Sequence, residues 1–95
     1  MRPNVSSIPT KELAHIIEDL RPLVLSVDAL NPDPKNARSH NARNNRAIRE
    51  SFTRFGQRKP IVVRKAGMVV EAGNGTLSVA KELGWRWIAA VVVDD

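Results

Sequence analysis

Hydrophobic residues in the N-terminal part of the chain recur first at helical spacing and then in alternation. The helical spacing, with Thr10 available as a cap, predicts a helix over 11–21 that stops at the Arg21-Pro22 pair. Residues 23–30, LVLSVDAL, alternate and are rich in Val and Leu, which predicts a strand. The next stretch, NPDPKNARSHNARNN, has no apolar period and predicts a loop. Loops of this length in compact domains are usually functional or disordered.

The middle of the chain predicts a helix followed by a hairpin. Residues 44–55 return to helical spacing, and Gly56 is placed to end the helix as a C-cap. Residues 60–64 and 68–71 predict two strands joined by a tight Lys-Ala-Gly turn. The buried stripe of the helix is expected to comprise Ile48, Phe52 and Phe55.

The C-terminal part predicts a second short helix and a last strand. Residues 75–83 form the helix, which Gly84 closes, and its inner face is expected to carry Leu77, Ala80 and Leu83. The final WIAAVVVDD is continuously apolar before its acidic end, which is typical of a strand in the middle of a sheet. The expected fold class is therefore α+β, with a small mixed sheet and short helices.

Length and composition restrict the class of protein. A chain of 95 residues suits one small domain. The chain contains no cysteine, which excludes a disulfide framework, a thiolate metal site and a cysteine nucleophile. No apolar run approaches the roughly 20 residues of a membrane helix, and the opening MRPNVSSIPTKEL lacks the apolar core of a secretory signal. We therefore expect a cytoplasmic protein with no membrane partner.

Positive charge is concentrated in one third of the chain. Residues 35–65 carry ten basic residues against Glu50 alone, a net charge of +9, while each flank carries −2. Such a concentration favours a polyanionic partner, above all DNA, over a basic face that only aids solubility. The candidate nucleic-acid contacts are Lys35, Arg43, Arg46, Arg49, Arg54, Arg58 and Lys59.

A glycine-rich turn in EAGNGTLSVAKELGW, residues 71–85, stands where a strand is expected to become a helix. The first N–H groups of a helix have no partner inside it and attract anions, and glycines let a phosphate approach the backbone. The Thr76 and Ser78 hydroxyls would add donors. The alternative is a plain turn in which Asn74 is an ordinary N-cap. The turn has no lysine, so it is not a Walker A motif.

A second candidate site lies in DPKNARSH, residues 33–40. Arg38 suits bidentate phosphate binding, and Lys35 would add a point charge. His40 is either a general base, a phosphate contact or a solvated loop histidine. His15 is expected to be inert. Glu71 is available to hold Mg²⁺ beside a phosphate but is expected to be merely exposed, so no metal site is predicted.

The order of these motifs resembles the N-terminal domain of the ParB family, also called the ParB-like nuclease domain, of the ParB/sulfiredoxin superfamily. The resemblance covers residues 23–95 and leaves 1–22 as an N-terminal helical extension. It is strongest to the version found in phages and mobile elements. The matching positions are Asn36 and Arg38 in an Asn-x-Arg box, Phe55, Gly56 and Pro60 after the basic helix, Gly73 to Thr76 in the glycine box, and Ala80, Leu83 and Gly84 behind it.

The resemblance implies that the Asn-x-Arg loop and the glycine turn converge on one phosphate-binding pocket, formed by Asn36, Arg38, Gly73, Asn74, Gly75 and Thr76. Chromosome-partitioning members typically carry arginines in the glycine box, and this chain has none there, so CTP hydrolysis is not carried over. Sulfiredoxins place a catalytic cysteine where Asn74 stands, which excludes their chemistry. The histidine, arginine and glutamate of the related serine kinases have no counterpart that we can place.

Three functions remain open on these observations. The first is a DNA-binding domain that holds backbone or nucleotide phosphates. The second is a phosphate-directed enzyme, either a weak nuclease or a nucleotide hydrolase, which would use a nucleotide with Mg²⁺ and employ Arg38 with His40 or Glu71. The third is an interaction module that forms a homodimer or binds a partner protein through the N-terminal helix.

Overall fold

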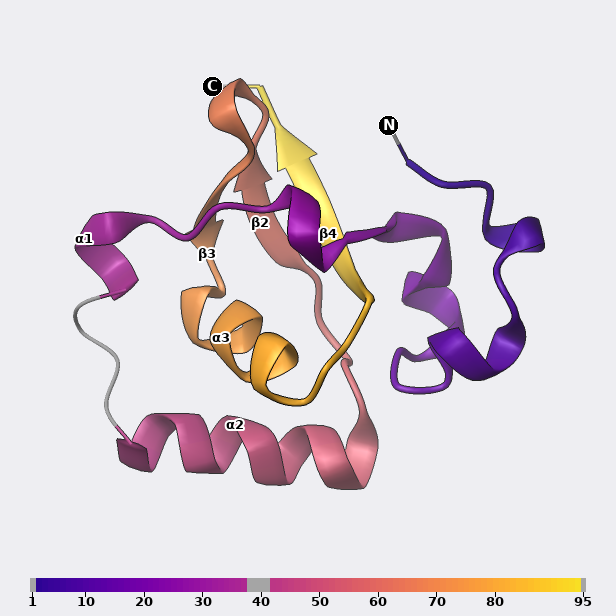
Figure 1. The fold of residues 1–95 in the computed structure, drawn as a ribbon, viewed down its shortest axis with the longest axis horizontal. Helices are drawn as coiled ribbons and strands as arrows, with labels where there is room; N and C mark the ends of the chain where they lie inside the picture. The colour runs from indigo at the N-terminus through magenta and orange to yellow at the C-terminus, as the bar shows by residue number, and fades with distance from the viewer. Residues whose placement is uncertain (1, 38–41, 95) are drawn as a thin grey trace.

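The computed structural model describes residues 2–37 and 42–94, which form a mixed β-sheet with helices packed beside it (Figure 1). The strands are β1 (Val24–Ser26), β2 (Ile61–Arg64), β3 (Val69–Ala72) and β4 (Trp87–Val93). The α-helices are α1 (Pro34–Ala37), α2 (Ala42–Phe55) and α3 (Asn74–Glu82). Short 3₁₀-helices are η1 (Val5–Ser7), η2 (Thr10–Leu13), η3 (Glu18–Leu23), η4 (Val27–Ala29) and η5 (Ala66–Met68).

The last strand lies inside the sheet, as its continuous apolar sequence predicts. Among the described residues the strand order is β1-β4-β2-β3, with β4 antiparallel to β1 and parallel to β2, and β2 antiparallel to β3. Ile88 and Ala90 of β4 belong to the larger core cluster with Leu77 of α3, whereas Ala89 belongs to a second cluster. Because alternate β4 side chains are buried in different clusters, both faces of this strand are covered. The predicted α+β class with a small mixed sheet is confirmed.

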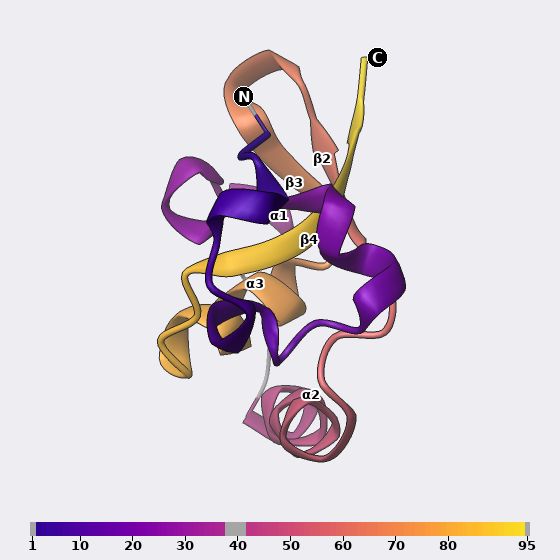
Figure 2. The same ribbon diagram turned by 90° about the vertical axis from the view of Figure 1, so that its right-hand side faces the viewer.

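The two longer helices form successive layers below the sheet. In both views α3 lies between the strands and α2 (Figures 1 and 2). The contact between α2 and the segment after α3 includes Phe52, whose ring stacks on Trp85 with centroids 4.7 Å apart. Arg49 of α2 also forms an ion pair with Glu82 at the end of α3. The helix α2, which carries the basic residues, is therefore held mainly by α3 and by the segment that follows α3.

The N-terminal segment differs from the predicted continuous helix. It contains the 3₁₀-helices η2 and η3, with Pro22 inside η3, and Ile16 between them forms an isolated bridge with Gln57. An apolar spacing of three residues fits a 3₁₀-helix as well as an α-helix. Short 3₁₀-helices form here because Ile16 pairs with another segment, which interrupts a continuous helix. Leu13 and Ile16 are buried in the second core cluster with Ala89 of β4. The division into 1–22 and 23–95 stays a prediction.

Three other expectations are corrected in part. The predicted strand over 23–30 is only three residues long, because its second half turns into η4. The predicted loop that follows contains α1. On α3, Leu83 is the C-cap and is 40% exposed, while Val79 is buried. Within the described part of the chain we find no helix with both the length and the apolar character needed to span a bilayer.

Candidate phosphate-binding site

The glycine-rich turn joins β3 directly to α3, and Gly73 is its N-cap residue. Gly73 has a left-handed backbone with φ of 103°, and a Cβ added there would lie 2.3 Å from Cγ2 of Ile61. Only glycine fits this position, because both the backbone conformation and the contact with β2 exclude a side chain. Asn74 lies inside the helix, so its predicted role as N-cap is wrong.

The Asn74 side chain is instead a buried connector, with only 6% of the residue exposed. Its Oδ1 accepts a hydrogen bond from the Asp33 N–H at 2.9 Å, and its Nδ2 donates to the Val70 carbonyl at 2.9 Å. Both ends of the amide are therefore used inside the protein, which is what a buried amide requires. Any anion at this turn would be met by the backbone of α3, through Gly75 and Thr76, rather than by the Asn74 side chain.

The Asn74 hydrogen bond brings the segment before α1 to the start of α3. The Asp33 carboxylate accepts from the Lys35 N–H at 2.9 Å at the beginning of α1, and α1 and α3 are in contact. Asn36 lies in α1 and Lys35 is exposed there. Arg38 and His40 lie outside the described residues. The predicted convergence of the Asn-x-Arg box on the glycine turn therefore stays a prediction.

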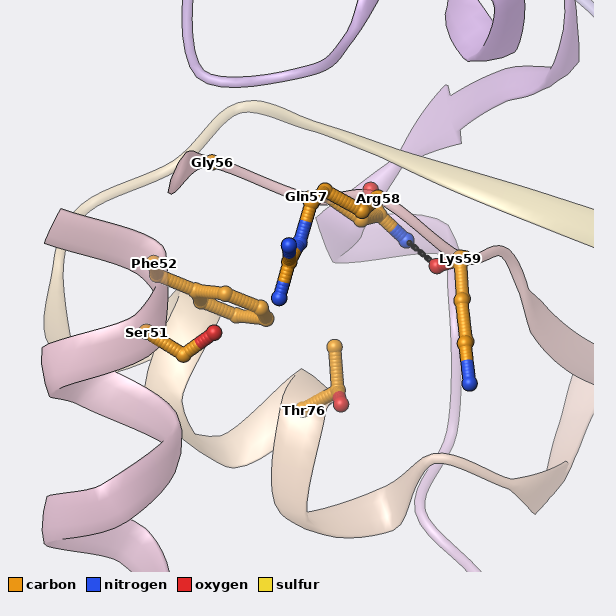
Figure 3. A pocket seen from close by; sticks show the side chains of 7 residues that line it. All are labelled: Ser51, Phe52, Gly56, Gln57, Arg58, Lys59 and Thr76. Atoms are coloured by element: carbon orange, nitrogen blue, oxygen red, sulfur yellow. Dashed lines mark hydrogen bonds between the residues drawn. The ribbon is translucent and has the colours of Figure 1, made fainter. Parts of the chain in front are cut away.

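A pocket of about 500 Å³ lies between α2, the start of α3 and the 56–59 connection to β2. Arg58 and Lys59 extend their charged ends from this connection toward α3, while Ser51 and Phe52 project from α2 (Figure 3). The lining thus combines two cations with two hydroxyl groups and one aromatic ring. Its residues are Ser51, Phe52, Gly56, Gln57, Arg58, Lys59 and Thr76.

The amino end of α3 borders this pocket through one residue. Thr76, in the first turn of α3, lines the pocket. An α-helix of this kind leaves the N–H groups of Asn74, Gly75 and Thr76 without partners inside the helix, and its dipole favours an anion at this end. Thr76, one of the predicted phosphate-binding residues, therefore lines the same pocket as Arg58 and Lys59, which are predicted nucleic-acid contacts. Sequence spacing alone does not bring the two sets together.

Gln57 holds in place the 56–59 segment with Arg58 and Lys59, called the cationic connection below. Gln57 is not among the predicted site residues. The residue is 1% exposed, and its Nε2 donates to the Lys59 and Ala89 carbonyls at 2.9 Å each. Its Oε1 accepts from the Ala89 N–H at 2.7 Å, and its backbone pairs with the His15 carbonyl and the Ile17 N–H. A single glutamine after a helix-ending glycine has no periodic signal. Only the fold shows that it fixes the two residues that follow it.

The remaining basic residues spread along α2 beyond the pocket. Arg43 and Arg46 are exposed on the helix. Arg49 is half-exposed, and its guanidinium is paired with Glu82, so part of its charge is neutralised locally. The predicted basic helix is thus present in the structure, and its role in binding nucleic acid stays a prediction.

Phe55, expected in the buried stripe, is 51% exposed. Phe52 occupies the inner position by stacking on Trp85, and Gly56 turns the chain with a left-handed φ of 70° immediately after Phe55. Two exposed basic residues lie over the Phe55 ring, with Cζ of Arg58 at 4.4 Å and Cζ of Arg54 at 5.8 Å from its centroid. An aromatic ring therefore stands among cations at the end of α2.

The other titratable candidates lie elsewhere. His15 is half-buried, its Nε2 donates to the Trp87 carbonyl at 2.8 Å, and its ring lies 4.1 Å from that of Trp85. Burial lowers the pKa of His15, with a smaller lowering from the Arg21 charge and an opposing effect of the Trp87 hydrogen bond. Glu71 is half-buried on β3. The residues described here contain no group of three or more His, Asp or Glu side chains placed to hold a metal ion.

The mixed sheet with its short helices has a ParB/sulfiredoxin-like fold, as three solved structures show. Sulfiredoxin from Arabidopsis thaliana matches with a TM-score of 0.66 at 18% identity, over 76% of this chain and 83% of that chain. A Pnob8-like ParB-N domain matches with a TM-score of 0.66 at 20% identity. The C-terminally truncated chromosome-partitioning protein ParB from Caulobacter crescentus, complexed with CTP-gamma-S, matches with a TM-score of 0.65 at 20% identity.

The ParB matches span less than half of the matched chains. Each ParB match covers 76% of this chain, but only 29% of the Pnob8-like chain and 43% of the Caulobacter chain. No protein-family model matches the sequence, and a search of curated proteins finds no match. At such low identity the likeness establishes the fold, and function has to be argued from the site.

Proposed function

We propose that this chain is a DNA-binding domain with a ParB-like fold that holds a phosphate group in the pocket between α2 and α3. The observation that carries the proposal is the meeting of Arg58 and Lys59 with Thr76 at the start of α3. Cationic side chains, hydroxyls and helix N-termini are the groups by which proteins bind DNA phosphates. The net charge of +9 over residues 35–65 extends this attraction along α2.

Several parts of the proposal reach beyond the pocket. Asn36 and Arg38 would complete the phosphate site from the α1 side, while Lys35, Arg43, Arg46 and Arg54 would contact neighbouring phosphates. The proposal places the protein among the phage and mobile-element versions of the fold, with cytoplasmic residence. For a homodimer or partner protein at residues 1–22, the accessible surface excludes Leu13 and Ile16, whose side chains are buried against β1 and β4.

A nucleotide is the alternative phosphate ligand, because one structural neighbour was solved with CTP-gamma-S. Arg58, Lys59 and the two hydroxyls would hold the phosphate group of such a nucleotide, and Mg²⁺ would supply further charge neutralisation when bound with it. These lining groups bind and orient phosphate. We therefore propose binding as the function, with a nuclease or nucleotide hydrolase as the alternative.

The test measures DNA binding by fluorescence anisotropy over a range of salt concentrations. Arg58→Ala/Lys59→Ala removes the pocket cations, and Arg64→Ala/Lys65→Ala removes the same charges from the far end of β2. The pocket variant should weaken binding by about tenfold or more relative to the control, because a hydrogen bond to a charged group contributes about 1.5 to 3 kcal/mol. It should also flatten the salt dependence, by about one unit of log–log slope for each phosphate that the variant no longer neutralises.

Two results would overturn the proposal. Binding that does not change with salt would mean that phosphate contacts do not drive it. Equal losses in the two double variants would mean that total charge, and not the pocket, determines affinity. Parallel incubations of labelled DNA, CTP and ATP with Mg²⁺ test the enzyme alternative, which requires turnover that falls with the pocket variant.

A further inference from the structure

We infer that Phe55 is a stacking platform for an unpaired base, so that the DNA held by the α2–α3 pocket is single-stranded. This inference rests on the proposed function, since the pocket would hold the phosphate of the same strand. The first observation is exposure: Phe55 is 51% exposed, more than the other exposed large hydrophobic residues Ile17, Leu83 and Val91. The half-exposed ring of Phe55 lacks the packing that Phe52, one turn earlier on the helix, has against Trp85.

The second observation is the set of charges around the ring. The guanidinium groups of Arg54 and Arg58 lie within cation–π distance of the Phe55 centroid, at 5.8 and 4.4 Å. Proteins that bind single strands combine aromatic rings, on which bases stack, with basic side chains that follow the backbone. Arginine guanidinium planes also stack on bases. The surroundings of Phe55 therefore complement an anionic strand and do not resemble an apolar surface for another protein.

The third observation is continuity with the phosphate pocket. The Arg58 guanidinium lies 4.4 Å from the centroid of the Phe55 ring, and Arg58 also lines the pocket that contains Lys59 and Thr76. One side chain thus joins the place for a base to the place for a phosphate, as a nucleotide unit requires. The bases of a duplex are stacked on each other, so a side chain can stack on a base inside it only at the cost of opening a base step or flipping the base out. The arrangement consequently favours a single strand over a duplex.

The experiment compares three labelled probes by fluorescence anisotropy: a single strand, the corresponding duplex, and the single strand with abasic sites in place of its central bases. The wild-type protein should bind the single strand more tightly than the other two. Phe55→Ala should weaken binding of the intact strand by about 5- to 150-fold, the range measured when a stacking aromatic is removed. It should leave the abasic strand and the salt dependence unchanged, because the variant keeps every charge.

Two further variants separate stacking from apolar contact and from damage to the fold. Phe55→Trp should retain the preference for the intact strand over the abasic strand, whereas Phe55→Leu should lose it. Leu83→Ala, at another exposed apolar residue, should bind like wild type. Circular dichroism of each variant checks that the fold is retained.

The outcomes distinguish this inference from the proposed function. If Phe55→Ala keeps the wild-type preference for the intact strand, or if the duplex binds more tightly than the single strand, the stacking inference is wrong. When such binding still depends on salt and on Arg58 and Lys59, the phosphate-binding function stands without it. If the wild-type protein binds none of the three probes at low salt, both proposals fail.

Discussion

Gln57 is hydrogen-bonded to Ala89 through both ends of its side-chain amide. Its Nε2 donates to the Ala89 carbonyl and its Oε1 accepts from the Ala89 N–H. The side chain thus pairs with β4 as a neighbouring peptide group would, just before β2 begins its parallel pairing with β4 at Ala90. The cationic connection is anchored to the central strand by this pair.

Replacing Gln57 with alanine should lower the free energy of unfolding by about 3 kcal/mol or more, because three buried polar groups lose their partner and each such loss costs about 1 to 3 kcal/mol. The groups affected are the Ala89 N–H and carbonyl and the Lys59 carbonyl. Urea unfolding measures the change. Thr53→Ala on the exposed face of α2 is the control and should stay within about 0.5 kcal/mol. A Gln57→Ala value as small as that of the control would show that the pair contributes little.

Gly73 and Gly84 provide a matched pair for the glycine turn. Both have left-handed backbones, with φ of 103° and 75°, so alanine costs about 1 to 2 kcal/mol at either position. An added Cβ meets Cγ2 of Ile61 at 2.3 Å at Gly73, but nothing within 4 Å at Gly84. Gly73→Ala should therefore destabilise the protein by about 1 to 3 kcal/mol more than Gly84→Ala. Equal losses in thermal or urea unfolding would contradict the close contact with β2.

The Asn74 side chain should control the attachment of the segment before α1. Asn74→Ala removes the partners of the Asp33 N–H and the Val70 carbonyl, and we expect a loss of about 2 to 3 kcal/mol with faster hydrogen exchange at the Asp33 amide. Asn31→Ala, which removes an exposed bond to the Gly67 carbonyl, is the control and should cost less than about 1 kcal/mol. An unchanged Asp33 exchange rate would show that other contacts hold this segment.

The stability of the protein should fall as His15 is driven to take up a proton. Its pKa is lowered in the folded protein, mainly by burial, so between that value and the ordinary 6.5 or so the unfolded chain binds more protons. The contribution of His15 is therefore fully present above about pH 6.5 and is lost as the pH falls through the folded value. Unfolding free energies at several pH values measure it. His15→Gln should reduce this dependence, and a dependence that His15→Gln leaves unchanged would assign it to other groups.

Amide NMR titration with inorganic phosphate, CTP, ATP and single-stranded DNA should locate the anion site. We expect the largest shifts at Gly75, Thr76 and Lys59. Gly75 and Thr76 lie at the start of α3, and Lys59 lines the pocket beside Thr76. Amides of β4 such as Val92 serve as the internal control. Shifts confined to α2, with none at the start of α3, would place the anion on the basic helix instead of in the pocket.

The sequence predicts the sheet better than the N-terminal segment, for physical reasons. The last strand is recognisable because β4 is covered on both faces and so must be apolar at successive positions. The helix α2 is recognisable because its basic and apolar positions separate at helical spacing. For Leu13 and Ile16 the same spacing fits 3₁₀ turns, and the tertiary pairing of Ile16 with Gln57 decides between them.

The candidate site is only partly predictable because its parts come from distant segments. Thr76, Arg58 and Lys59 are identifiable from local patterns, but nothing in their spacing indicates that they share a pocket with Ser51. Phe52, and not Phe55, stacks on Trp85, and this choice depends on how α2 lies against α3 and the segment after it. The burial of Asn74 likewise depends on Asp33, forty-one positions away in the chain.

The position of α2 outside α3 separates the exposed basic residues of α2 from the core of this small domain. Arg43 and Arg46 stand in solvent, and the core clusters are built from the strands, α3 and the N-terminal segment. Replacing Arg43 and Arg46 alters the electric field of the molecule without changing a buried contact. The strength and range of that field can therefore be adjusted, by evolution or by design, while the scaffold that supports it stays the same.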